Sequence, residues 1–190
     1  MNNSDKKLLC YSHEEFDKLM IKNGWIGQPS KNVAIISIAY CLDENPYHHF
    51  KYTDADNVLN IDFSDCSPEE WWNGEDRYDE LFDFFVTNKS DKTTAGDNRF
   101  SHIESSGDVI MALNYAQASR IVNFIDKQIS KDVDAFYIHC SAGKSRSQGV
   151  VRYILDTYPQ YNWETNPDNP CITPNYHVVR MLKRCFINNL

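Results

Sequence analysis

AFYIHCSAGKSRSQGV, residues 135–150, is the stretch that decides the fold class. Its first part, Ala135 to His139, is a short run of apolar, aromatic and β-branched residues, which is typical of a buried strand. A loop of small residues follows, and the chain then carries apolar side chains at helical spacing, namely Val150, Val151, Ile154, Leu155 and Tyr158. A strand that passes through a short loop into a helix is typical of α/β proteins with parallel sheets.

Two further strands and an amphipathic helix extend that alternation. VAIISIA at Val33–Ala39 is apolar and β-branched, as in a buried strand. NVLNIDF at Asn57–Phe63 alternates apolar and polar residues, as in a half-buried strand. Between Ala118 and Ile129 the apolar residues recur at helical spacing. The sequence therefore predicts an α/β protein of one domain, with a central, mostly parallel sheet flanked by helices.

The remaining segments carry weaker signals. We expect the first element to be a helix that begins at Ser12, because Glu15 completes a capping box with it. Ser67 and Pro68 indicate the start of another helix, which is interrupted at Gly74 before DRYDELFDFFV at 76–86. Residues 87–107 are polar and predict a long loop. Thr173 is expected to cap the last helix, with Pro174 in its first turn.

Composition and charge narrow the classes of function. The chain has 190 residues, with 19 Lys and Arg against 27 Asp and Glu, so its formal net charge is −8. This balance disfavours binding to nucleic acid or to an anionic membrane, since both need a positive surface. The six cysteines form no C-x-x-C pair, so we expect free thiols, no metal site and no cofactor. No segment is typical of a signal peptide or a membrane span, and we expect a cytoplasmic protein.

The loop after the buried strand has the features of an anion-binding site. Cys140 stands at the end of the strand, and the following amides, with the start of a helix, can surround a bound oxyanion. Arg146 is placed to grip two oxygens of that anion. The same positive field favours the thiolate form of a cysteine at this place. GKS at 143–145 is not a nucleotide-binding P-loop, because Ile138 stands where its first glycine would be.

His139-Cys140-x5-Arg146-Ser147 resembles the signature loop of cysteine-dependent protein phosphatases, closest to the dual-specificity and small tyrosine-phosphatase-like group. The likeness covers Val33–Leu155 in outline, apart from an insertion at about 66–107. It implies a dual-specificity-phosphatase-like fold and one catalytic domain over residues 1–190. It also implies roles: Cys140 as the nucleophile, Ser147 steadying the thiolate, His139 tuning it, and Ser141, Ala142, Gly143, Lys144, Ser145 and Arg146 binding phosphate. Lys144 has two interpretations, contact with substrate or a place on the loop rim.

The family uses an aspartate on another loop as general acid. Asp65 stands in FSD after the alternating strand and resembles the start of the acid loop in several relatives. Asp108 lies 32 residues before Cys140, the usual chain distance in dual-specificity enzymes, but the insertion makes that distance a weaker guide. We favour Asp65, with Asp108 as the alternative and Asp62 or none as the remainder. If Asp65 overhangs the site, Cys66 could form a disulfide with Cys140 on oxidation.

The resemblance implies a metal-independent phosphomonoester hydrolase with phosphoprotein substrates, phosphotyrosine before phosphoserine or phosphothreonine. One alternative is an RNA 5′-phosphatase of the same fold, against which the net charge of −8 counts. The other is a phosphate-binding pseudophosphatase that holds phosphoproteins without turnover. Tyr47, His48 and His49 could line the mouth of the pocket, although a solvated loop is the simpler interpretation.

Overall fold

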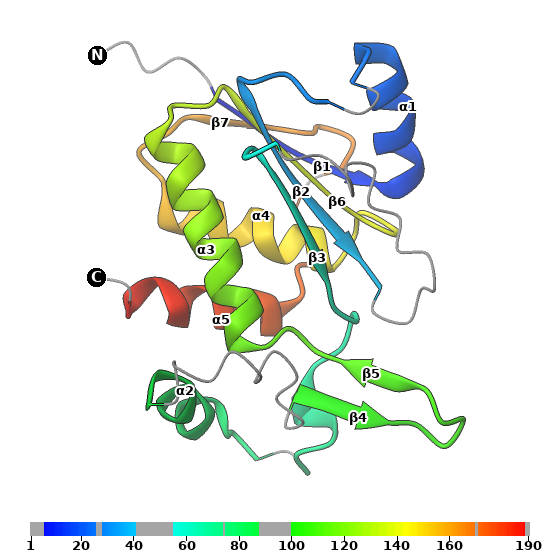
Figure 1. The fold of residues 1–190 in the computed structure, drawn as a ribbon, viewed down its shortest axis with the longest axis vertical. Helices are drawn as coiled ribbons and strands as arrows, with labels where there is room; N and C mark the ends of the chain where they lie inside the picture. Colours follow the sequence, from blue (N-terminus) through cyan, green and yellow to red (C-terminus); the bar gives the residue numbers. More distant parts are fainter. Residues whose placement is uncertain are drawn as a thin grey trace.

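The protein is described by a computed structural model, which gives the structure of residues 6–25, 28–40, 55–73, 75–87, 100–169 and 171–188. It is an α/β protein with a central five-stranded sheet (Figure 1). The strands lie in the order β3-β2-β6-β1-β7, and every neighbouring pair is parallel. Their bounds are Lys6–Ser12 for β1, Val33–Ala39 for β2, Val58–Asp62 for β3, Ala135–Cys140 for β6 and Trp163–Thr165 for β7.

The middle strand of the sheet is β6. Its last residue, Cys140, is paired in register with Ser12, the last residue of β1. On the other side of β6, β2 pairs with β3, and their last residues, Ala39 and Asp62, are also in register. Because all five strands run the same way, their carboxyl ends meet at one edge of the sheet, and Cys140 lies in the middle of that edge.

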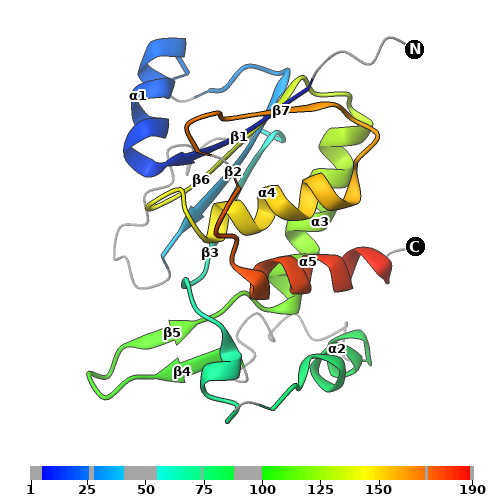
Figure 2. The ribbon, with the colours of Figure 1, turned by 180° about the vertical axis from the view of Figure 1, so that it is seen from behind.

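Helices cover both faces of the sheet (Figures 1 and 2). One face packs on α1 (His13–Asn23), whose Phe16 and Met20 form a small core with Val33, Ile35 and Ala135. The other face carries the main core, to which three helices contribute. These are α3 (Tyr115–Ser130), α4 (Arg146–Thr157) and α5 (Tyr176–Ile187). Among the described helices none is long and apolar enough to cross a membrane.

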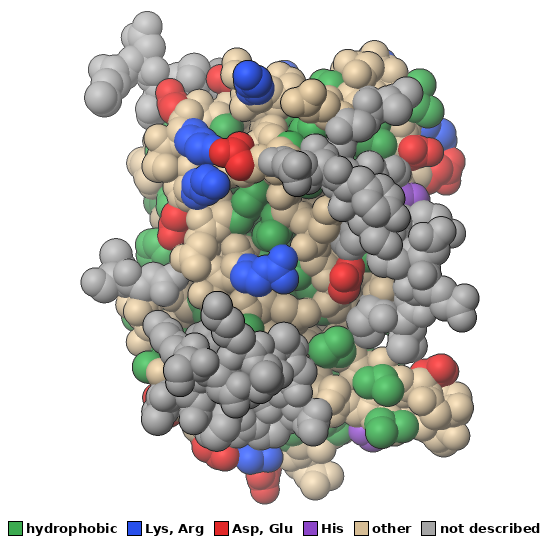
Figure 3. Space-filling model, viewed as in Figure 1, with side chains coloured by type: hydrophobic (Ala, Val, Ile, Leu, Met, Phe, Trp, Pro, Cys, Tyr) green, Lys and Arg blue, Asp and Glu red, His purple; other side chains and the backbone are tan. Residues whose placement is uncertain are grey.

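The segment predicted as an insertion packs on the same main core. Its elements are the 3-10 helix η1 (Pro68–Glu70), the helix α2 (Tyr78–Thr87) and the strand β4 (Ser101–Ile103), which pairs antiparallel with β5 (Val109–Met111). On one face of the β4–β5 hairpin, His102 stacks on Trp71 with ring centroids 5.6 Å apart. On the other face Ile103 and Val109 are 67% and 43% exposed, and Figure 3 shows hydrophobic side chains there.

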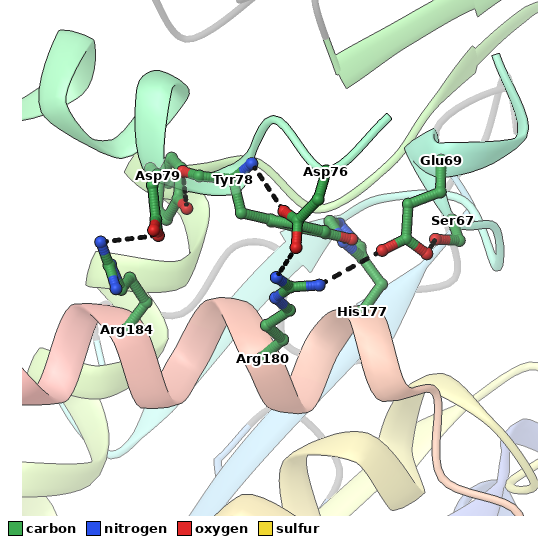
Figure 4. A network of polar contacts seen from close by, with 9 residues as sticks. Ser67, Glu69, Asp76, Tyr78, Asp79, His177, Arg180 and Arg184 are labelled. Carbon is green, nitrogen blue, oxygen red and sulfur yellow. Dashed lines mark hydrogen bonds and ion pairs between the residues drawn. The ribbon is translucent and has the colours of Figure 1, made fainter. Parts of the chain in front are cut away.

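Polar contacts fasten this segment to α5 (Figure 4). Arg180 of α5 lies 3.9 Å from the centroid of the Tyr78 ring and pairs with Asp76 and Glu69. The buried ring of His177, also on α5, bridges α2 and the segment between β5 and α3: Nδ1 lies 2.8 Å from the Tyr78 hydroxyl and Nε2 2.8 Å from the carbonyl of Leu113. A carbonyl can only accept, so Nε2 carries the proton and Nδ1 accepts from Tyr78. Burial lowers the pKa of His177 to about 4.

The strongest sequence signals are confirmed. The capping box of Ser12 and Glu15 begins α1, and the two expected strands are β2 and β3. The predicted helix over 118–129 is the centre of α3, and residues 135–150 form β6, a loop and the start of α4. The sheet was expected to be mostly parallel, and all of its described pairings are parallel.

Several weaker predictions are wrong. The first described element is the strand β1, not a helix, because residues 6–12 pair with β6 and β7. The first part of the helix expected from Ser67 is only the 3-10 turn η1, whereas its expected second part, over DRYDELFDFFV, is confirmed as α2. Residues 101–103 of the expected loop form β4. Thr173 does not cap α5: Asn175 is its N-cap, and the Asn175 side chain accepts from the amide of Val178.

Candidate active site

Cys140 lies at the centre of the candidate site, at the end of β6 and 2% exposed. Two hydrogen-bonding groups face its sulfur. The amide of Gly143 donates to Cys140 Sγ over 3.3 Å, and Ser147 Oγ lies 3.1 Å from the same sulfur. A thiolate would thus meet two donors, one from the loop and one from the first turn of α4.

The loop bends so tightly that only glycine fits at position 143. Gly143 has φ +69°, in the left-handed region that other residues avoid. A Cβ atom there would lie 2.5 Å from the Ser12 nitrogen and 2.6 Å from the Tyr11 carbonyl carbon. The amide of His13 also donates to the Ser141 carbonyl over 3.2 Å. The end of β1 and the start of α1 therefore form one wall of the loop.

Arg146, the first residue of α4, turns its side chain back under the loop and is 5% exposed. Its Nη1 donates to the carbonyls of Ala39 and Phe63, over 2.9 and 2.8 Å. Its Nη2 donates to Ser141 Oγ over 2.9 Å. The buried Nε has no hydrogen-bond partner in the described part of the chain. The edge formed by Nε and Nη2 is the pair of donors that binds two oxygens of an oxyanion.

The loop amides add to this positive site. Ser145 is the N-cap of α4, but its side chain makes no capping bond. Within the described residues, no acceptor for the amides of Ala142, Lys144 and Ser145 is found. Free amides at a helix N-terminus attract an anion. The side chain of Lys144 is exposed, and its carbonyl accepts from Thr173 Oγ1 over 2.8 Å.

The structure brings Asp65 to this loop. Asp65 is exposed, and its Oδ1 accepts from Ser145 Oγ over 2.6 Å and from Asn175 Nδ2 over 2.9 Å. Asp108 is placed elsewhere: it lies in the turn of the β4–β5 hairpin, where its carboxylate accepts from Ser106 Oγ over 2.8 Å. Of the two candidate acids, Asp65 is the one in contact with the predicted phosphate-binding residues.

His139 faces the other side of the sheet from the main core. Its ring stacks on Phe16 of α1, with centroids 4.4 Å apart and planes 15° apart, and lies 6.0 Å from the ring of His13. It is buried next to Cys140 in the chain. The contacts thus place His139 as packing between β6 and α1, and the tuning role expected of it stays a prediction.

A cavity of about 340 Å³ opens beside Cys140. Its described lining comes from the ends of β2 and β6 and the start of α1, namely His13, Glu14, Ile38, Ala39, His139, Cys140 and Ser141. Cys66 lines a different cavity, of about 540 Å³, with Trp71 and His102. The geometry therefore gives no support to the predicted Cys66–Cys140 disulfide. Tyr47, His48 and His49 lie outside the described residues.

Sequence reasoning missed residues that hold the loop from a distance. Asn169 Nδ2 donates to the carbonyls of Gly143 and Cys10, over 3.0 and 3.2 Å. Asn175 contacts both Asp65 and the loop, since its amide donates to the Ser145 carbonyl over 3.1 Å. Cys10 of β1 lies under the loop, with Sγ 3.2 Å from Ser147 Oγ. The sequence signal for the two asparagines is that the loop before α5 is rich in this residue, a feature that many loops share.

In the part of the chain that the structure describes, no three His, Cys, Asp or Glu side chains gather as metal ligands would. Scans against protein-family models, curated proteins and solved structures found no match. The likeness to cysteine-dependent phosphatases therefore depends on the residues of the signature loop and on their geometry.

Proposed function

We propose that this protein is a phosphomonoester hydrolase with a dual-specificity-phosphatase-like fold, which acts on phosphoproteins through a cysteinyl phosphate on Cys140. The observation that carries the proposal is the buried guanidinium of Arg146, whose Nε has no partner in the described chain and which shares the loop with Cys140. A buried charged donor without an acceptor is costly, and a bound phosphate would supply the acceptor.

The chemistry follows from the contacts of the loop. Cys140 Sγ attacks phosphorus in line with the leaving oxygen, so an S–P bond forms while the P–O bond breaks. The loop amides and Arg146 hold the three equatorial oxygens. Water then attacks the same phosphorus and the S–P bond breaks. The released thiolate is stabilised by the Gly143 amide and by Ser147 Oγ, which lie 3.3 and 3.1 Å from the sulfur.

We assign Asp65 as the general acid of the proposed reaction. Both donors that reach it bind Oδ1, whereas Oδ2 has no hydrogen-bond partner among the described residues. In a protonated Asp65 the proton therefore belongs on Oδ2, from which it passes to the leaving oxygen. The resulting carboxylate takes a proton from the attacking water in the second step. Asp108 lacks such a contact with the loop.

The cavity beside Cys140 favours an aryl phosphate. Its lining includes Ile38 and Ala39 of β2 and His13 of α1, together with Cys140. An aromatic ring gains more from such a surface than a short alkyl chain does. We therefore place phosphotyrosine before phosphoserine and phosphothreonine as the substrate.

The test is phosphate release from a phosphotyrosine peptide in EDTA, with the wild type beside Cys140→Ser. We expect release by the wild type and none by the variant. Binding of the peptide without release would favour the pseudophosphatase, and release only from 5′-phosphorylated RNA would favour the RNA 5′-phosphatase.

The assignment of the acid is tested by Asp65→Asn beside Asp108→Asn. We expect Asp65→Asn to lower kcat by about 10²-fold or more on a phosphotyrosine peptide, since general acids contribute about 10²- to 10⁴-fold. The loss should shrink on an aryl phosphate whose leaving group needs no proton. Asp108→Asn should keep the wild-type rate, and the reverse result would reassign the role.

A further inference from the structure

A second buried thiol, that of Cys10, contacts the same serine hydroxyl as the candidate nucleophile. Cys10 of β1 is 3% exposed, and its Sγ lies 3.2 Å from Ser147 Oγ and 3.4 Å from the Gly143 carbonyl. Ser147 Oγ lies 3.1 Å from Cys140 Sγ on its other side. The Ser147 hydroxyl is therefore held between two sulfur atoms, and the direction of its single proton matters for a thiolate at Cys140.

Other contacts limit where that proton can go. A serine in a helix often donates to the carbonyl four residues earlier, which for Ser147 is Gly143. That carbonyl already accepts from Asn169 Nδ2 over 3.0 Å and from Gln148 Nε2 over 3.4 Å. Cys10 is held neutral, because burial raises its pKa to about 12. Its S–H has two acceptors in reach: the Gly143 carbonyl at 3.4 Å, which already accepts from the two side-chain amides, and Ser147 Oγ at the shorter distance of 3.2 Å. The S–H is therefore assigned to Ser147 Oγ.

We propose that Cys10 is a positioning residue for the nucleophile: its S–H donates to Ser147 Oγ and thereby directs the Ser147 O–H toward the sulfur of Cys140. The consequence is a more stable thiolate, both before attack and when it leaves the phosphorus. The part concerning turnover rests on the proposed function, but the part concerning the thiolate does not.

The test separates the donor from the packing. Cys10→Val fills a similar volume without a donor, whereas Cys10→Ser keeps one. Cys185→Ala is the control, because Cys185 is equally buried, at 3% exposed, and contacts the Tyr115 carbonyl rather than the loop. The measurement is the pH dependence of Cys140 alkylation by iodoacetamide in reduced protein, located by peptide mass mapping, with urea unfolding to show that each variant is folded.

We expect the midpoint of Cys140 alkylation to move up by about half a pH unit to one unit in Cys10→Val, the size of one modest hydrogen bond. Cys10→Ser and Cys185→Ala should keep the wild-type midpoint. An unchanged profile in folded Cys10→Val would overturn the proposal, and so would an equal shift in Cys185→Ala or in Cys10→Ser. A shift in Cys10→Val alone, in a protein that releases no phosphate, would refute the proposed function and leave this inference standing.

Discussion

Replacing Gly143 by alanine tests how the loop is built. The backbone there has φ +69°, and a left-handed conformation costs an ordinary residue about 1–2 kcal/mol. The new Cβ would also meet the Ser12 nitrogen at 2.5 Å and the Tyr11 carbonyl carbon at 2.6 Å. These are backbone atoms of β1, so they cannot turn aside as a flexible side chain would. Overpacking of this kind costs about 1–3 kcal/mol more.

Gly24→Ala is the matched control. Gly24 has nearly the same φ, +65°, but a Cβ there has nothing within 4 Å. Urea unfolding should show Gly143→Ala to be about 1–3 kcal/mol less stable than Gly24→Ala, the contribution of the clash alone. The melting temperature should fall in parallel, by about 2–4 °C for each kcal/mol of lost stability in a chain of this size. Equal losses in the two variants would refute the contact between the loop and β1.

Two more predictions concern buried charges and rings. Arg146→Lys should weaken competitive inhibition by inorganic phosphate by about 10²-fold and lower the free energy of urea unfolding by about 2 kcal/mol. The reason is that lysine cannot replace the guanidinium, which donates to two carbonyls and to Ser141 Oγ. Arg152→Lys, on an exposed ion pair, should change neither. For His177, burial lowers the folded pKa to about 4, below the ordinary histidine value of 6.5, so the contribution of His177 to stability is complete above pH 6.5 and is lost as the pH falls toward 4. The free energy of unfolding should drop by about 3 kcal/mol over that window in the wild type and by less in His177→Gln. An equal pH dependence of the unfolding free energy in the two proteins would contradict the lowered pKa of His177.

Local patterns were enough to predict much of the fold but not β1, an internal strand of the sheet. β3 and α3 carry their own periodicity and β2 and β6 are short apolar runs, so the sequence indicated all four directly. β1 does not: KKLLCYS has only four adjacent hydrophobic residues, which do not alternate with polar ones, and it is a strand because β6 and β7 pair with it on both sides. Partners far away in the chain cannot be read from a window of seven residues.

The same limit applies to the site. Cys140 and Arg146 could be predicted from the sequence because they lie on one contiguous strand, loop and helix. Thr173 was expected to cap α5 because proline follows it, but its hydroxyl donates to the Lys144 carbonyl, and the N-cap of the helix is Asn175, two residues later. Asn175 and Cys10 reach the loop only through tertiary contacts.

The most direct test of the account is to trap the intermediate. The wild-type protein is mixed with excess phosphotyrosine peptide in EDTA, quenched in acid within the first turnover and mapped by peptide mass spectrometry. We predict one phosphoryl group on the peptide that contains Cys140, and none in Cys140→Ser. Phosphate release that proceeds at the wild-type rate in Cys140→Ser, or a phosphoryl group carried by another residue, would contradict the central claim that Cys140 is the nucleophile.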